Sequence, residues 1–414
     1  MTSLAIRNAE TTVPFGNEGP VRGADLSSIE VVSHAAIGCE GGVVASVGEA
    51  PKTEVDFDAS DCTVVPGFVD CHTHLPFFGW RADEDAARLA GRRYEDLHHE
   101  EGGIYRSARM LADASDAEVL DFSHRLALAM LRHGTTTLET KSGYGLSLAG
   151  ELRQVRLARS LAELVPQRVQ TTCLAAHAVP KGKLQGEWTA EAADELLPRA
   201  AQDGASACDV YVESIAFGLE HAARLAEAAA GVGMRMRIHA DQLEDSQAGA
   251  FAARWGFATA DHLNHTSLDA ASDIAQSDTA AVLLPGATFT LRQNKKPPAR
   301  DLIERGAVVA LGTDLNPGTS PIHSMPFVIA LACRLYGLRP LEALAAATVN
   351  AAFALGIDDE VGRIARGRRA DLVVLDAPSF DAVPYRPDHD PVAAVVCGGE
   401  LAHVAPWAEH RVKR

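Results

Sequence analysis

The 414-residue sequence has a deficit of positive charge: 38 lysines and arginines stand against 55 aspartates and glutamates, a net charge of -17. Such a protein repels phosphate backbones and anionic lipid headgroups, so neither nucleic acid nor a membrane surface is expected as a partner. A small anionic substrate would need a local basic group to bind against that field.

Cysteine is also scarce, with seven residues at positions 39, 62, 71, 173, 208, 333 and 397. None of them form a C-x-x-C pair, so neither a zinc knuckle nor a disulfide framework is expected. Free and mostly buried thiols in a cytoplasmic protein are expected instead. No apolar run is long enough to cross a bilayer, and residues 1–8 lack the basic start and apolar core of a signal peptide.

Short β segments between glycine and proline turns are expected at both ends of the chain, over residues 1–63 and 361–414. Because chain termini often lie close together, we expect the two ends to build one small β-sandwich domain. Residues 64–360 alternate strands with amphipathic helices, which predicts an α/β fold with a TIM-like (β/α)8 barrel. The expected barrel strands are Val64–Asp70, Thr135–Thr140, Val169–Ala175, Cys208–Glu213, Arg235–Ala240, Thr259–His262, Ala280–Leu284 and Val308–Thr313.

The first of these strands leads into the pair His72 and His74. A strand projects residues i and i+2 to the same side, so both side chains can reach one metal ion. Neutral imidazoles bind zinc or iron. An H-x-H pair alone is equally compatible with two chance histidines at a strand end.

Polar side chains follow most of the other expected strands as well. In a barrel of this type the catalytic residues gather at the C-terminal strand ends. We therefore expect one site to be formed by the residues found there. These are the segment Glu139–Gly145 and the residues His177, Glu213, His239, His262 and Asp314.

His72, His74, His239 and Asp314 offer three imidazoles and a carboxylate, which leaves an open position for water. A bound metal lowers the pKa of that water, and Asp314 can accept its proton and pass it to a leaving nitrogen. The alternative for Asp314 is an ordinary turn or N-cap aspartate. His262 is expected to polarise a carbonyl or to hold the attacking water; the alternative is a core histidine.

The number of metal ions follows from the residue after the fourth strand. Two-metal barrels often bridge their ions with a carbamylated lysine, but here that residue is Glu213, while Lys141 lies in a glycine-rich turn. We therefore expect one divalent or trivalent ion, zinc or iron, and a hydrogen-bonding role for Glu213. His98 and His99, in an acidic segment, are expected to face solvent.

Several strings of the sequence resemble the imidazolonepropionases, a family of amidohydrolases in histidine degradation. The similarity covers about residues 60–375, and two of its strings, Thr348–Ala352 and Gly367–Leu372, are typical of the wider superfamily. The more specific strings are Glu139–Leu146, Ala176–Pro180, His239–Gln242, Ala260–Leu263, Leu283–Gly286 and Thr313–Gly318.

The resemblance implies hydrolysis of 4-imidazolone-5-propanoate to N-formimino-L-glutamate by a cytoplasmic homodimer. It implies the four metal ligands named above. It also implies that Arg81 binds the substrate carboxylate, because a guanidinium can form a bidentate pair with a carboxylate. A surface arginine is the alternative for Arg81, loop packing for Tyr144 and Thr319, and a simple turn for Gly318. The implied substrate contacts are Tyr144, His177, Gln242, Asn316, Gly318 and Thr319.

The sequence departs from the family pattern around the substrate pocket. Trp80 stands where a small residue is common, Glu101–Ile104 keeps part of a glycine-rich string, and Leu111 with Ala112 replaces a Thr-Arg pair. Gln242 is glutamate in some members, and glutamine cannot act as a base, so proton transfer falls to the aspartate and histidine considered above. The alternatives are a hydrolase or deaminase of a related cyclic amide, amidine or nucleobase, and a metal-free barrel scaffold.

Overall fold

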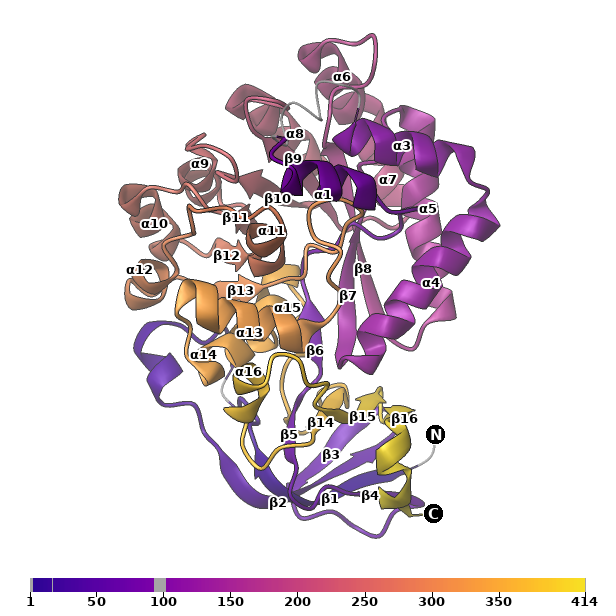
Figure 1. The fold of residues 1–414 in the computed structure, drawn as a ribbon, viewed down its shortest axis with the longest axis vertical. Coiled ribbons are helices and arrows are strands. Elements are labelled where there is room, and N and C mark those ends of the chain that lie inside the picture. Colours follow the sequence, from indigo (N-terminus) through magenta and orange to yellow (C-terminus); the bar gives the residue numbers. More distant parts are fainter. Residues whose placement is uncertain (1–2, 17, 93–101, 414) are drawn as a thin grey trace.

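The computed structural model describes residues 3–16, 18–92 and 102–413, so His98, His99 and Glu101 lie outside the described residues. Two sheets organise the chain, one of 8 strands and one of 9 (Figure 1). The 8-stranded sheet and its helices form the upper part of the view, while the other sheet lies below it, together with both chain termini. Within the described residues, no helix combines the length and apolar character needed to cross a membrane.

The 8-stranded sheet is parallel, and its strands follow one another in sequence order from β6 to β13. With helices between the strands, it confirms the expected (β/α)8 barrel. Its strands are β6 (Phe68–Asp70), β7 (Thr135–Lys141), β8 (Arg168–Ala176), β9 (Ala207–Val212), β10 (Arg235–Ala240), β11 (Thr259–His262), β12 (Ala280–Leu283) and β13 (Val309–Leu311).

Helices surround the barrel, and their buried residues recur at helical spacing, as Leu152, Val155 and Leu161 do in α5. Helix α4 begins with a capping box in which Ser115 and Glu118 satisfy each other's main-chain N–H groups. The helices are α1 (Ala82–Leu89), α3 (Gly103–Asp113), α4 (Asp116–Arg132), α5 (Leu148–Leu164), α6 (Gln185–Glu191), η2 (Ala192–Leu196, a π-helical turn), α7 (Leu197–Gln202), α8 (Leu219–Gly231), α9 (Ala248–Trp255), α10 (Leu268–Ala275), α11 (Pro285–Thr290), α12 (Ala299–Glu304), α13 (Met325–Tyr336), α14 (Pro340–Ala346), α15 (Val349–Leu355) and α16 (Ala382–Tyr385).

The second sheet is built from both ends of the chain, as the sequence predicts. Strand β1 (Leu4–Thr12) pairs with β2 along one edge and with β4 and β5 along the other, so the sheet branches and encloses its own core around Ile6, Ile37, Phe57 and Leu372. The other elements are η1 (Gly23–Ser27), β2 (Val32–Glu40), β3 (Val43–Gly48), β4 (Val55–Asp58), β5 (Thr63–Pro66), β14 (Leu372–Leu375), β15 (Val392–Cys397), β16 (Glu400–Val404), η3 (Pro406–Arg411) and β17 (Val412–Lys413).

The expected single strand Val64–Asp70 is wrong, because the chain changes sheets at Gly67. Residues before it form β5 of the small sheet, and residues after it form β6 of the barrel. A side chain at Gly67 would be 2.1 Å from Thr136 Oγ1, so only glycine allows the two elements to approach here. We propose Gly67 as the start of the barrel domain, with the preceding residues and 361–414 forming the small domain.

The seam between the first and last barrel strands closes beyond their ends. Thr73 and Leu315 form a parallel bridge. The Asp314 N–H donates to the His72 carbonyl at 2.9 Å, and the His74 N–H donates to the Leu315 carbonyl at 2.9 Å. The residues that close the barrel are thus the expected metal ligands and their neighbours.

Candidate active site

The C-terminal strand ends of the barrel surround one cavity. Most of the expected site residues line it, while His72 lies beneath it and Gly318 lies behind Arg81. Sequence reasoning missed two lining residues, Ile104 and Tyr211. The lining consists of His74, Arg81, Ile104, Tyr144, His177, Tyr211, His239, Gln242, His262, Asp314, Asn316 and Thr319.

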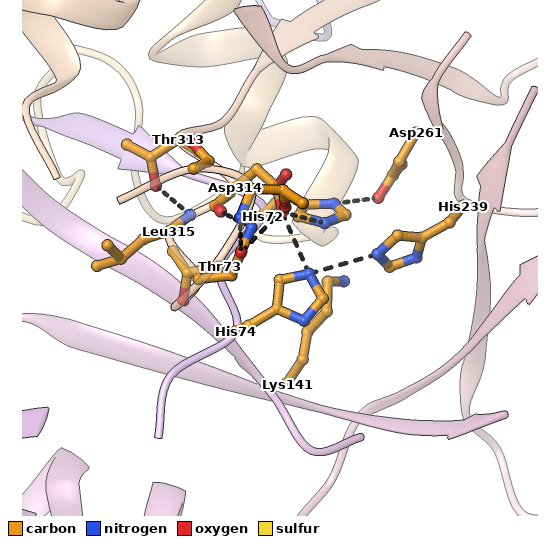
Figure 2. Close-up of polar contacts among 12 residues, drawn as sticks. His72, Thr73, His74, Lys141, His239, Asp261, Thr313, Asp314 and Leu315 are labelled. Atoms are coloured by element: carbon orange, nitrogen blue, oxygen red, sulfur yellow. Dashed lines mark hydrogen bonds and ion pairs between the residues drawn. The ribbon is translucent and has the colours of Figure 1, made fainter. Parts of the chain in front are cut away.

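Four of the expected residues point toward one another at the base of this cavity (Figure 2). His74 Nε2 lies 3.2 Å from Asp314 Oδ1 and 3.4 Å from His239 Nε2, and His72 Nε2 lies 3.6 Å from Asp314 Oδ1. Ligand atoms of His72, His74 and Asp314 all lie within 4.8 Å of one another, as do those of His72, His239 and His262. The sequence thus found side chains that the fold brings together.

This group fits a metal ion. His72 Nε2 is buried, and no hydrogen bond satisfies it among the described residues. A buried, unsatisfied nitrogen that faces a carboxylate and two further imidazoles is costly unless a cation binds there. His72, His74, His239 and Asp314 could hold one ion, and zinc or iron accepts this donor set.

Two aspartates that sequence reasoning missed orient the histidines. His72 Nδ1–H donates to Asp261 Oδ2 at 2.6 Å, and His239 Nδ1–H donates to Asp209 Oδ1 at 3.1 Å. A proton fixed on Nδ1 leaves the Nε2 lone pair free to bind a metal. The sequence offered one signal for Asp209. It lies two residues before Tyr211 in a strand, so both side chains lie on the same face of that strand.

A buried cluster of charged side chains supports the two aspartates. Lys141 Nζ donates to Glu139 Oε1 and Asp209 Oδ2, each at 2.7 Å. Arg237 Nη2 lies 3.5 Å from Asp261 Oδ2. Burial raises the pKa of Asp209, but Lys141 and the neighbouring imidazole outweigh it and hold that pKa well below its ordinary value. The sequence prediction that placed Lys141 in a turn is wrong, because it is the last residue of β7.

His72, His74 and His262 have lowered pKa values and are neutral. Burial, together with nearby positive groups, holds the pKa of His72 well below its ordinary value and lowers the pKa of His74. Burial likewise lowers the pKa of His262 to about 3. Burial raises the pKa of Asp314, but its contacts with His74 and His262 outweigh this and lower it. Neutral imidazoles and an ionised carboxylate are the forms that bind metals.

His262 and Asp314 also share an uncommon backbone conformation. Their φ angles are 77° and 54°, in the left-handed region that side chains other than glycine seldom adopt. Such strained residues cluster at functional sites, where the surrounding structure holds them in place. The strain turns both side chains toward the cavity that they line.

Arg81 lies at the start of α1 with only 2% of its surface exposed. Its Nη1 is 3.4 Å from Glu84 Oε2, yet among the described residues neither Nε nor Nη1 makes a hydrogen bond. Asn316 shapes the facing loop, because its Oδ1 accepts the N–H groups of Gly318 and Thr319 at 3.0 and 2.7 Å. A buried guanidinium with free donors can therefore bind an anion in the cavity.

Aromatic rings and amides form the remaining walls. The His177 ring stacks on His74 with 5.2 Å between centroids, and Tyr144 lies 5.9 Å from His74. His177 Nδ1–H donates to the Gly143 carbonyl at 2.9 Å, which leaves Nε2 as an acceptor. Trp80 does not line the cavity; its ring lies 5.4 Å from the Phe77 ring.

Comparison with known proteins agrees with the fold. The amidohydrolase family matches residues 63–404. Two solved structures share the fold: triazine hydrolase from Arthrobacter aurescens (TM-score 0.75, 16% identity, 98% of this chain and 96% of that one covered) and a zinc-bound adenosine deaminase from Xanthomonas campestris (TM-score 0.68, 18% identity, 97% and 94% covered).

Closer similarity is found to proteins named imidazolonepropionase. The one from Rubrobacter xylanophilus is 43% identical over 411 residues, which cover 97% of this chain and 98% of the relative. The one from Symbiobacterium thermophilum is 40% identical over 397 residues, which cover 92% and 93%. This chain belongs to the imidazolonepropionase family of amidohydrolases.

Proposed function

We propose that this chain hydrolyses 4-imidazolone-5-propanoate to N-formimino-L-glutamate in the degradation of histidine. The observation that carries the proposal is the pairing, in one cavity, of a buried arginine that has free donors with a group of metal-binding side chains. The substrate has the same two parts, a carboxylate tail and a ring carbonyl next to a nitrogen.

His72, His74, His239 and Asp314 would hold one zinc or iron ion. When bound, such an ion polarises the ring carbonyl and makes water a stronger nucleophile at neutral pH. The amidohydrolase family implies a divalent ion, and the three imidazoles add no negative charge to the carboxylate.

Arg81 binds the propanoate carboxylate through two parallel hydrogen bonds and so fixes the distance from the tail to the ring. Tyr144, His177, Gln242 and Thr319 surround the ring. Asn316 and Gly318 hold the loop that faces the arginine.

The residues at the base move the protons. Asp314, which is ionised, accepts a proton from the attacking water through a carboxylate oxygen. The water oxygen bonds to the ring carbonyl carbon, the bond from that carbon to the ring nitrogen breaks, and Asp314 returns the proton to this nitrogen. His262, which is neutral, orients the water by hydrogen bonding. The products of this step are a carboxylic acid, which keeps the second proton of the water and then releases it to solvent, and an open formimino group, so atoms and charge balance.

A neutral nucleobase or uncharged cyclic amide has no anionic group for the Arg81 donors that make no hydrogen bond among the described residues, Nε and Nη1, which disfavours these substrates. The complete set of metal-binding side chains likewise disfavours a metal-free scaffold. We also propose a cytoplasmic homodimer, which the family resemblance supports and which sedimentation of the purified protein tests.

The test follows the loss of substrate absorbance with pure, metal-loaded enzyme and with an Arg81→Ala variant. The variant should raise KM by about ten- to a hundred-fold, because a hydrogen bond to a charged group contributes about 1.5–3 kcal/mol. Arg125→Ala, which removes an exposed arginine of α4, is the control and should keep the wild-type KM. Absence of turnover by the wild type would overturn the assignment, and an unchanged KM for Arg81→Ala would overturn the role of the arginine.

A further inference from the structure

The main chain of Gln242 is held from two sides by side chains that take no part in the proposed reaction. Gln242 lines the cavity and follows Asp241, whose φ of 52° turns the chain sharply after β10. Its N–H donates to Glu213 Oε1 at 2.6 Å, and its carbonyl accepts a hydrogen bond from Gln293 Nε2 at 2.9 Å. Both polar groups of this peptide segment are thus satisfied by distant parts of the barrel.

We call Glu213 and Gln293, which bind the N–H and the carbonyl of Gln242, the clamp. Glu213 follows β9 and forms its first side. The same Oε1 also accepts the Leu243 N–H at 2.8 Å. The side chain is buried, and among the described residues its Oε2 has no hydrogen-bond partner. Burial raises the pKa of Glu213 to about 8, so the group is protonated at neutral pH and the bonds need only a neutral acceptor oxygen.

Gln293, in the loop between α11 and α12, forms the second side. Its Oε1 accepts a hydrogen bond from Asn264 Nδ2 at 3.1 Å, and the same Nδ2 donates to Thr288 Oγ1 at 2.8 Å. Thr288 Oγ1 in turn lies 2.7 Å from the hydroxyl of Tyr336. Because Gln293 accepts at its oxygen, its amide is oriented with the nitrogen toward Gln242.

We propose that Glu213 and Gln293 are positioning residues of the substrate site, which fix the Gln242 peptide so that its side-chain amide faces the substrate ring. This inference rests on the proposed function. An amide both donates and accepts, which suits a ring that carries a carbonyl beside a nitrogen, but only if the amide is held in one orientation. The clamp supplies that orientation from the connections that follow strands four and seven of the barrel.

The first experiment compares Gln293→Leu with Gln167→Leu. Gln167 is a buried residue that also donates to a main-chain carbonyl, that of Ala127, but it does not line the cavity. Both variants lose a hydrogen bond to a main-chain carbonyl, and Gln293→Leu also loses the bond that Asn264 donates. Gln293→Leu should raise KM by about ten-fold with kcat changed less than about two-fold, whereas Gln167→Leu should keep the wild-type KM. Equal KM values for the two variants would overturn the proposal.

A double-mutant cycle separates positioning from a general structural effect. If Gln293 acts through Gln242, then Gln293→Leu should have little further effect on KM in a Gln242→Ala background. Additive effects of the two substitutions would show that Gln293 acts independently of Gln242, against the proposal.

The Glu213 side is tested by Glu213→Gln and Glu213→Leu. The amide retains an acceptor oxygen and the leucine does not, so Glu213→Gln should raise KM less than Glu213→Leu does. Equal increases in KM would contradict the role of Glu213 as an acceptor.

Amide hydrogen exchange makes the test independent of the reaction. The peptide that contains Gln242 and Leu243 should exchange faster in Gln293→Leu than in the wild type, and at the wild-type rate in Gln167→Leu. If the wild type fails to turn over the substrate, the proposed function fails, while this exchange still decides whether the clamp exists. Unchanged exchange in Gln293→Leu would overturn it.

Discussion

The Arg81 guanidinium occupies the space beside Gly318 that any side chain at that position would need. A Cβ built on Gly318 would be 1.7 Å from Arg81 Nη2. Arg88 Nη2 donates to the Gly318 carbonyl at 2.7 Å and fixes the same loop from α1. The anchor proposed for the substrate carboxylate therefore depends on a glycine that follows the last barrel strand.

Replacing this glycine should displace the arginine without removing it. We expect Gly318→Ala to raise KM by about ten-fold or more, because the guanidinium loses its bidentate geometry, while kcat changes less. Steady-state kinetics measure both constants. Gly186→Ala is the matched control, since a Cβ there has no heavy atom within 4 Å. A KM for Gly318→Ala equal to that of the control would show that the arginine tolerates the displacement.

Removing charge behind a histidine should weaken metal binding. Asp261→Asn keeps the shape of the side chain but replaces the carboxylate that accepts the His72 Nδ1–H. The zinc affinity, measured by competition with a chelator, should fall about ten- to a hundred-fold. Asp273→Asn, at an exposed residue of α10, provides the comparison. Equal affinities would mean that the carboxylate does not tune the site.

The raised pKa of Glu213 predicts how stability depends on pH. Its folded-state pKa is about 8 against an ordinary 4.5, so the folded protein holds this proton more tightly than the unfolded chain does. The contribution of Glu213 to the free energy of unfolding is therefore full below about pH 4.5 and is lost as pH rises through about 8.

Glu213→Gln removes this titration. The free energy of unfolding of the wild type relative to the variant should fall by about 2–4 kcal/mol between pH 5 and pH 8.5. Urea unfolding at several pH values measures it, with Glu227→Gln, at an exposed residue of α8, as the reference. A difference that stays constant with pH would place the titration elsewhere.

The barrel and the convergence of the proposed metal ligands were predictable because both follow from local rules. Strands alternate with helices along the chain, and the polar residues His239 and Asp314 stand at or just after strand ends, where a parallel barrel gathers them. The change of sheet at Gly67 was not predictable. The apolar residues on both sides of it form one unbroken run that carries no sign of a second sheet.

The charged side chains beneath the site could not be predicted either, for a reason different from that at Gly67. Asp209, Asp261 and Lys141 are charged residues of strands with no exposed surface, and sequence alone does not show which buried charges compensate each other. Their pairing depends on the register of three alternate strands, β7, β9 and β11. The clamp on Gln242 is similarly distributed, since Glu213 and Gln293 are far apart in the sequence.

The position of the site at the seam of the barrel determines when its residues become available during synthesis. His72 and His74 follow the first barrel strand, and Asp314, which completes the four side chains, follows the last. The histidines leave the ribosome long before the aspartate does, so the nascent chain has no full set of ligands until the barrel is nearly complete. A metal ion held by these four proposed ligands would therefore couple its binding to the final closure of the barrel, so that the supply of metal would influence how firmly the seam stays shut.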